Sequence, residues 1–351
     1  MKTGKLSMMI IIIALLLIGG CNKSQTQADA TPSPSNTEVP VNTSTSSVTP
    51  SGSNEELAME AYEKFLNNEA SLSFDRYMQK GYFINPDNTE EPLFQKGTEY
   101  TLSEILKKLT AYYLEHSDNK KINYIDYAFI DCGKDGEGEL LLRFNGMDID
   151  GADDNSTLVY VIKYIDGKLY LCYYYETWAR SETSINEYGF ITSSGSGGAS
   201  LHITDYSFID KNGNWRPIVY VESELNINTL QQFENLAKLV EAKGVKDIIQ
   251  LDTIRFDYDP SASEQDNGEV FYTFYVYNEN WEPVEDANLY TDSVYKKIFE
   301  EANVSFITPD ELSVKISEKE QTLGVTAEIK EGAEVSWKTL KSDIYSDYVE
   351  S

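Results

Sequence analysis

The stretch DYAFIDCGKDGEGELLLRF, residues 126–144, consists of two apolar runs separated by a short acidic, glycine-rich turn. Two such runs joined by a tight turn are typical of an antiparallel hairpin. The opening of the stretch returns as DYSFID at 205–210, and the turn at 210–214, DKNGN, follows it. The sequence therefore predicts two hairpins that begin with similar strands.

Around these hairpins, from 122 to 225, the hydrophobic period is 2 rather than 3.6, and aromatic and β-branched residues form short runs broken by Gly, Asp and Asn. This pattern predicts an antiparallel meander. Asp166-Gly167 is a typical two-residue hairpin turn. The expected strands are 122–130, 138–145, 157–164, 168–177, 185–191, 203–209 and 216–223.

Helical patterns lie on both sides of this region. A helix is expected at 54–67, and another starts at Thr101, with Glu104 as its capping-box partner. After 226 we expect a helix that ends near Gly244, strands at 248–258 and 270–277, and helices at 291–302 and from Thr308. The predicted fold is α+β: a helical lead-in and central antiparallel β-sheet region at 54–225, then a smaller C-terminal α+β domain at 226–351.

The first 53 residues have the pattern of a targeting sequence and are not expected to belong to the folded part of the chain. Lys2 and Lys5 precede an apolar run that ends at Gly20, as in a secretory signal peptide at 1–20. Ile18-Gly19-Gly20-Cys21 resembles a bacterial lipobox, which implies cleavage before Cys21 and attachment of a diacylglycerol to its thiol. The alternative is an ordinary signal with an incidental cysteine. Residues 21–53 are rich in Ser, Thr, Asn and Pro, a composition typical of a disordered tether.

The charge balance restricts the partners. The chain has 58 acidic and 29 basic residues, for a net charge of −29. Such a protein is repelled by phosphate backbones, so nucleic acid is not an expected partner. The excess of acid favours cations or basic partners, or it serves solubility alone.

Few residues are available for cysteine or histidine chemistry. Beyond Cys21 the chain has Cys132 and Cys172, and its histidines are His116 and His202. This set is too small for the usual zinc sites, and it gives little support to nucleophile–histidine catalysis. An exported protein permits a bridge between the two cysteines, but spacing alone does not decide whether one forms.

The turn inside 126–144 resembles the calcium-type DxDGDGxxEL loops of cell-surface repeat proteins. Asp131, Asp135 and Glu139 match the ligand positions, whereas Gly133 and Lys134 remove an oxygen and add a positive charge. The resemblance implies at most weak calcium binding, and the sequence indicates no other cofactor. The alternative, for this turn and for 210–214, is a plain hairpin turn whose Asn and Gly residues supply positive φ.

Two further sets of side chains are candidates for ligand contact. Trp178, Arg180 and Glu182 combine aromatic and charged groups as sugar-binding clefts do, although core or edge packing explains them too. Glu176 and Glu182 could act as a carboxylate pair, which a glycosidase needs about 5–10 Å apart.

The lipobox, the polar tether, the helix AYEKFLNNE and the loop FIDCGKDGEGEL together resemble clostridial-type surface lipoproteins of Gram-positive bacteria. The resemblance implies export and anchoring at the outer face of the cytoplasmic membrane, and it implies no activity. We therefore expect a non-enzymatic surface module that binds a polysaccharide, a peptide or a protein. A cell-wall or glycan hydrolase that uses paired carboxylates is the alternative.

Overall fold

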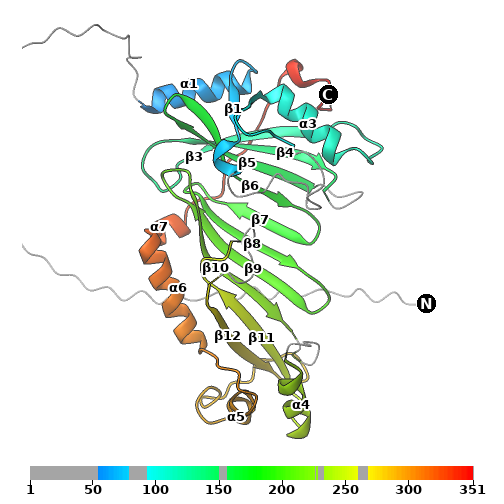
Figure 1. Ribbon diagram of the computed structural model, residues 1–351, viewed down its shortest axis with the longest axis vertical. Coiled ribbons are helices and arrows are strands. Elements are labelled where there is room, and N and C mark those ends of the chain that lie inside the picture. The colour runs from blue at the N-terminus through cyan, green and yellow to red at the C-terminus, as the bar shows by residue number, and fades with distance from the viewer. Residues whose placement is uncertain are drawn as a thin grey trace, which may run out of the picture. The chain divides into compact units, whose positions relative to one another are not determined.

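The computed structural model describes residues 54–78, 93–149, 156–225, 227, 233–259 and 268–350. The signal peptide, Cys21 and the tether predicted for 1–53 lie outside these described residues. The fold is α+β, as predicted, with two mostly antiparallel sheets and helices packed against them (Figure 1).

The first sheet is built around a four-strand meander that matches the predicted one from 122 to 177. Its strand order is β13-β3-β4-β5-β6-β1-β2, with β1 parallel to β6. Asp166 and Gly167 form the predicted turn between β5 and β6, both with positive φ. The strands are β1 (Ser71–Ser73), β2 (Glu99–Thr101), β3 (Tyr124–Ile130), β4 (Glu139–Met147), β5 (Ser156–Ile165), β6 (Lys168–Thr177) and β13 (Lys338–Thr339).

The second sheet is a six-strand meander with the order β12-β11-β10-β9-β8-β7. Its strands are β7 (Ser181–Ile185), β8 (Phe190–Ser196), β9 (Leu201–Ile209), β10 (Trp215–Glu224), β11 (Ile248–Arg255) and β12 (Val270–Tyr277). The single strand predicted at 185–191 is wrong, because a turn at 186–189 separates β7 from β8. The domain boundary expected at 225/226 falls inside this sheet, between β10 and β11, which pair directly.

The helices begin and end largely where the sequence places caps. Thr101 and Thr308 both form the expected capping boxes, and Gly244 has positive φ just after α4. Within the described residues no helix is long and apolar enough to cross a membrane. The helical segments are α1 (Asn54–Leu66), α2 (Asp75–Met78), α3 (Leu102–Tyr113), α4 (Glu234–Ala242), α5 (Val294–Glu301), α6 (Pro309–Leu323), α7 (Ala327–Lys330) and the 3₁₀ turn Asp343–Tyr345.

Both faces of the first sheet are buried, which explains why its strands carry apolar residues at successive positions and not only at alternate ones. Leu140 and Leu142 of β4 pack in a cluster with α1 and α3. Leu141, between them, faces the opposite side and belongs to a cluster that includes Ile185, Ile191 and Ile209 of the second sheet. A shared apolar core therefore joins the two sheets.

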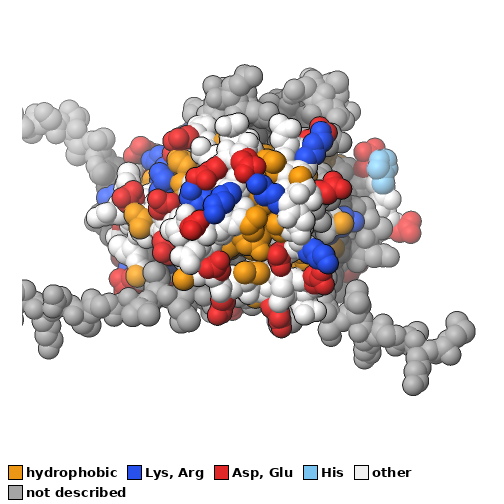
Figure 2. All heavy atoms as spheres, turned by 90° about the horizontal axis from the view of Figure 1, so that it is seen from below, with side chains coloured by type: hydrophobic (Ala, Val, Ile, Leu, Met, Phe, Trp, Pro, Cys, Tyr) orange, Lys and Arg blue, Asp and Glu red, His pale blue; other side chains and the backbone are white. Residues whose placement is uncertain are grey.

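The second sheet has its own helical cover. Phe208 and Ile254 pack with Leu312 of α6 and Ile329 of α7, while α4 and α5 pack on β11 and β12 in a separate cluster. Figure 2 shows one face of the molecule, on which acidic and basic side chains are interspersed. The excess of carboxylates therefore forms no separate acidic surface on that face.

Candidate functional site

The loop between β3 and β4 is held by its own side chains. The Asp131 carboxylate accepts hydrogen bonds from the backbone N–H groups of Asp135 (2.8 Å) and Gly136 (3.1 Å). Asp135 in turn accepts one from the N–H of Glu137 (2.9 Å). Short carboxylate side chains close turns in this way. The carboxylate oxygens of Asp131 thus already accept hydrogen bonds from the backbone of the loop.

Glu139, the third residue predicted to bind calcium, has a different partner. It is fully buried, pairs with Lys163 and accepts a hydrogen bond from the N–H of Cys132 (2.6 Å). Burial raises the pKa of Glu139 to about 7, although Lys163 opposes this effect. Desolvation alone would lower the pKa of Lys163, but Glu139 and the nearby Asp135 and Glu137 hold it above its ordinary value. The ammonium group of Lys163 therefore supplies the positive charge at these carboxylates.

The three residues predicted to bind calcium are not brought together as a ligand set. Across the part of the chain that the structure describes, no group of three or more His, Cys, Asp or Glu side chains is placed to hold a metal ion. Lys134 adds another ion pair at the loop, with Glu328. Calcium binding stays a prediction from the sequence, and a cation at Glu139 would have to displace Lys163.

The predicted ligand-binding residues lie at the connection from β6 to β7. Trp178 and Ser181 form an isolated antiparallel bridge there. Trp178 is half-buried, whereas Arg180 and Glu182 are exposed. These side chains belong to one hairpin connection, but they do not line the pocket described below.

Glu176, the suggested partner of Glu182, is engaged with a neighbouring helix. It accepts a hydrogen bond from the hydroxyl of Tyr113 in α3 (2.6 Å). Burial raises the pKa of Glu176, and this hydrogen bond opposes the rise. Glu176 thus contributes to the contact between α3 and the first sheet.

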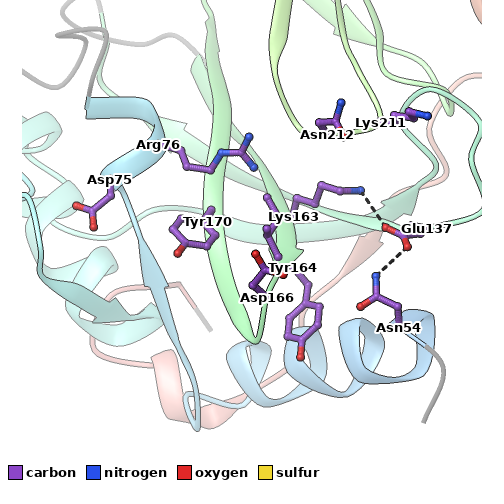
Figure 3. Close-up of a pocket in the computed structure, with 11 residues that line it drawn as sticks. Asn54, Asp75, Arg76, Glu137, Lys163, Tyr164, Asp166, Tyr170, Lys211 and Asn212 are labelled. Carbon is purple, nitrogen blue, oxygen red and sulfur yellow. Dashed lines mark hydrogen bonds and ion pairs between the residues drawn. The ribbon is translucent and has the colours of Figure 1, made fainter.

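A pocket of about 610 Å³ lies where the β5–β6 hairpin, the loop before β4, α2 and the β9–β10 turn meet (Figure 3). Cavities of this size are typical of sites for small ligands. Its lining carries charges of both signs. The cations are Arg76, Lys163 and Lys211, and the carboxylates are Asp75, Glu137 and Asp166.

The neutral part of the lining is aromatic and amide. Tyr164 and Tyr170 come from the β5–β6 hairpin, Asn54 from the start of α1 and Asn212 from the β9–β10 turn. The amide of Asn54 donates a hydrogen bond to Glu137 (2.8 Å), which fixes one wall (Figure 3). Tyrosine rings and amides offer flat contact surfaces and hydrogen bonds to a polar ligand.

The two turns singled out by the sequence touch at this pocket. Gly133 has positive φ, and a Cβ added to it would lie 2.9 Å from the backbone nitrogen of Lys211. The β9–β10 turn is closed by Asp210, which accepts hydrogen bonds from the N–H groups of Asn212 and Asn214 (both 2.9 Å). The recurring turns therefore pack on each other, and they place Glu137, Lys211 and Asn212 around one cavity.

Gly213, which follows Asn212 in the β9–β10 turn, packs closely against Cys172 of β6. A Cβ added to Gly213, which has positive φ, would lie 2.6 Å from the sulfur of Cys172. Burial raises the pKa of Cys172 to about 12, although Arg76 acts in the opposite direction. Burial also raises the pKa of Cys132. Both thiols are therefore neutral at physiological pH, and neutral thiols are weak nucleophiles.

Cys132 and Cys172 are both free. Cys132 follows β3 and Cys172 lies in β6, with β4 and β5 between these strands. The structure thus argues against a bridge between them.

The charges in the pocket differ in how they are compensated. Lys163 is paired with the buried Glu139, and it also lies 3.9 Å from Glu137 of the pocket lining. Arg76 donates a hydrogen bond to the side-chain oxygen of Asn214 (3.1 Å), a neutral group. Among the described residues, no carboxylate lies within 4.0 Å of Arg76 or Lys211, and no basic group lies that close to Asp166. The pocket therefore offers uncompensated charges of both signs to a ligand.

Sequence reasoning did not select the residues of this pocket. One signal was present, because Lys163 interrupts the apolar run VIKYI of β5, where a buried cation requires a partner. Arg76 and Lys211 carry no such signal, since they reach the pocket only through the packing of α2 and the β9–β10 turn.

A scan against protein-family models finds no match, and searches among curated proteins and solved structures likewise find nothing similar to this chain.

Proposed function

We propose that this protein is a lipid-anchored extracellular binding module, non-enzymatic, which holds a polar ligand in the pocket between the β5–β6 hairpin and the β9–β10 turn. The supporting observation is the pocket itself, of about 610 Å³, with uncompensated charges and two tyrosines in its lining. Small-ligand sites combine such a concave shape with a few convergent polar groups. The ligand classes are those expected from the sequence: a polysaccharide, a peptide or an exposed segment of a protein.

The test is a binding screen with the full-length chain in detergent micelles against an array of wall glycans and short peptides. Tyr170→Ala removes one aromatic wall of the pocket, and Tyr112→Ala is the matched control, because Tyr112 is 47% exposed and lies outside the pocket. Binding that falls at least tenfold in Tyr170→Ala alone supports the pocket as the site.

The other outcomes of the screen contradict the proposed binding site or the proposed binding function. Binding that is unchanged in Tyr170→Ala rules out the pocket, and a screen without any bound ligand rules out the binding function for these classes. Conversion of a bound glycan into shorter products would instead support the alternative function, hydrolysis by paired carboxylates.

The anchoring part of the proposal rests on Ile18-Gly19-Gly20-Cys21. The mature protein should carry its diacylglycerol on Cys21 and partition into the detergent phase. Cys21→Ala should abolish the diacylglycerol, and any of the variant that is still cleaved should move to the aqueous phase, because it has lost both the lipid and the apolar signal segment. If mass spectrometry finds no lipid on Cys21 of the wild type, or the cleaved variant still partitions as the wild type does, the anchor assignment is wrong.

A further inference from the structure

We infer that the ligand of this pocket is a short peptide whose free α-amino and α-carboxylate groups are both recognised. This inference rests on the proposed function and specifies the ligand class of the same site. It follows from the pairing of the charged side chains, because two cations and two carboxylates of the pocket lining have no ion-pair partner among the described residues.

The cationic region is formed by Arg76 and Lys211. Arg76 is half-buried in α2, and its guanidinium group uses one N–H on the neutral side chain of Asn214. A guanidinium has five N–H donors in a planar fork, which fits a carboxylate in a two-point contact. Lys211 stands on the opposing β9–β10 turn and adds a second positive charge.

The carboxylates without an ion-pair partner, called here the anionic region, are Asp166 and Asp75, whereas Glu137 lies 3.9 Å from Lys163. Asp166 is exposed at the tip of the β5–β6 hairpin, where a positive φ of 49° is required by the turn. Asp75 accepts a hydrogen bond from the N–H of Gly97 (2.7 Å), a neutral donor. These carboxylates can accept the N–H groups of an ammonium ion.

A zwitterion fits this arrangement better than the other ligand classes. A polyanion would approach Asp75, Glu137 and Asp166 and be repelled by them. A neutral glycan would displace water from charged groups without replacing the charge, which costs free energy. A short peptide with both ends free compensates both regions at once, and a cavity of about 610 Å³ is in the range for small ligands of this kind.

The probe is a pool of tripeptides randomised at every position, prepared in four forms: free, N-acetylated, C-amidated and blocked at both ends. The full-length chain in micelles is equilibrated with each pool, and the retained peptides are quantified by mass spectrometry. We expect the free pool to be retained best, with each blocking group reducing retention roughly tenfold, because each removes one charge-assisted contact.

Two variants assign the ends of the peptide to the two regions. Arg76→Gln should abolish the preference for the free over the amidated form and leave the acetylation effect intact. Asp166→Asn should do the reverse. The matched controls are Lys246→Gln and Asp118→Asn, whose side chains are exposed and lie outside the pocket. They should bind as the wild type does.

The outcomes separate this inference from the proposed function. Equal retention of all four forms, or no retention of any of them, overturns the peptide assignment. If a glycan still binds in a manner that depends on Tyr170, the pocket remains a binding site and only the ligand class is wrong. If neither peptides nor glycans bind, both proposals fall. Blocking effects that are unchanged in Arg76→Gln and Asp166→Asn also overturn the inference.

Discussion

The two copies of the recurring segment, 126–131 in β3 and 205–210 at the end of β9, share five of six letters and differ in their surroundings. In both, the final isoleucine packs in the core that joins the sheets, Ile130 from one copy and Ile209 from the other. Phe208 is 3% exposed beneath α6 and α7, whereas Phe129 is 36% exposed. The alternation of a strand fixes which side chains share a face. How deeply they are buried depends on what covers that face.

The first aspartate of each copy shows the difference most clearly. Asp126 is opposite Arg143 in the register of β3 and β4, and it accepts hydrogen bonds from Arg143 (2.7 Å) and from the hydroxyl of Thr339 (2.8 Å). Asp205 is opposite Ser193 and Tyr220. No hydrogen bond to the Asp205 side chain is found among the described residues. Burial raises its pKa to about 7.

The basic residue that could serve Asp205 is engaged elsewhere. Arg255 lies one strand beyond Tyr220 on the same row of the sheet, 3.6 Å from Glu222. The same aspartate is thus paired with a basic residue in one sheet and is unpaired in the other. The comparison shows that cross-strand register, rather than the local sequence, decides the role of a repeated acid.

The largest expected effect on stability follows from removing the paired aspartate, Asp126. Asp126→Ala should lower the free energy of unfolding by about 2–3 kcal/mol, because it leaves Arg143 and Asn145 without their buried acceptor. Urea denaturation measures the change. Asp118→Ala, at an exposed site, should cost less than about 0.5 kcal/mol. A loss below that level in Asp126→Ala would mean that the two copies do not differ energetically.

The unpaired member should behave in the opposite way. Because the pKa of Asp205 is about 7 in the fold and 3.8 is its ordinary value, the unfolded chain releases this proton first as the pH rises. Asp205 therefore weakens the fold progressively between about pH 4 and pH 7 and fully above it. Asp205→Asn should stabilise the protein by about 1–2 kcal/mol at pH 8, less than the full pKa shift implies because the side chain keeps some contact with water.

The same variant should have almost no effect at pH 3, where the carboxyl group is protonated in both states. Urea denaturation of the wild type and Asp205→Asn across this pH range measures the difference. A constant difference at all pH values would show that the side chain acts through packing and not through its charge.

A smaller effect is expected at the last aspartate of each copy, because both aspartates have the same role of closing a turn. Asp131→Ala and Asp210→Ala each remove a carboxylate that accepts backbone N–H groups of its turn, at a cost of about 1 kcal/mol each. The loss should be greater for Asp210, which also accepts a hydrogen bond from Arg216 (2.9 Å). Thermal unfolding of the alanine and asparagine variants measures both. Asparagine keeps an acceptor, so these variants should lose less than their alanine counterparts.

The smallest expected effect concerns calcium. From the sequence alone, an incomplete oxygen set predicts binding at the weak end, about 10⁻⁴–10⁻³ M, and the ion pair between Glu139 and Lys163 should weaken it beyond the millimolar range. With Lys163 already paired to Glu139, millimolar calcium should raise the melting temperature no more than sodium chloride of equal ionic strength. A calcium-specific rise that disappears in Asp135→Ala would contradict this expectation and establish the loop as a cation site.

The sequence alone determined the local features of this protein. The capping boxes at Thr101 and Thr308, the hairpin turn at Asp166-Gly167 and the period-2 strands around 126–144 lie where they were predicted. Each depends on contacts within a few residues, so the chain carries the necessary information locally. The lipobox resemblance at Cys21 is also a short linear pattern, and it stays a prediction from the sequence.

The tertiary structure decided which distant residues meet. The segment Ser193–Ser196 has little intrinsic preference for a strand and lies between the strands expected at 185–191 and 203–209, yet it pairs along β9 as part of β8. The pocket arises because the turn at Gly133 packs on the backbone of Lys211, and α2 brings Arg76 to the same cavity. Such juxtapositions depend on the order of strands and the packing of turns across the chain, and no spacing within one segment encodes them.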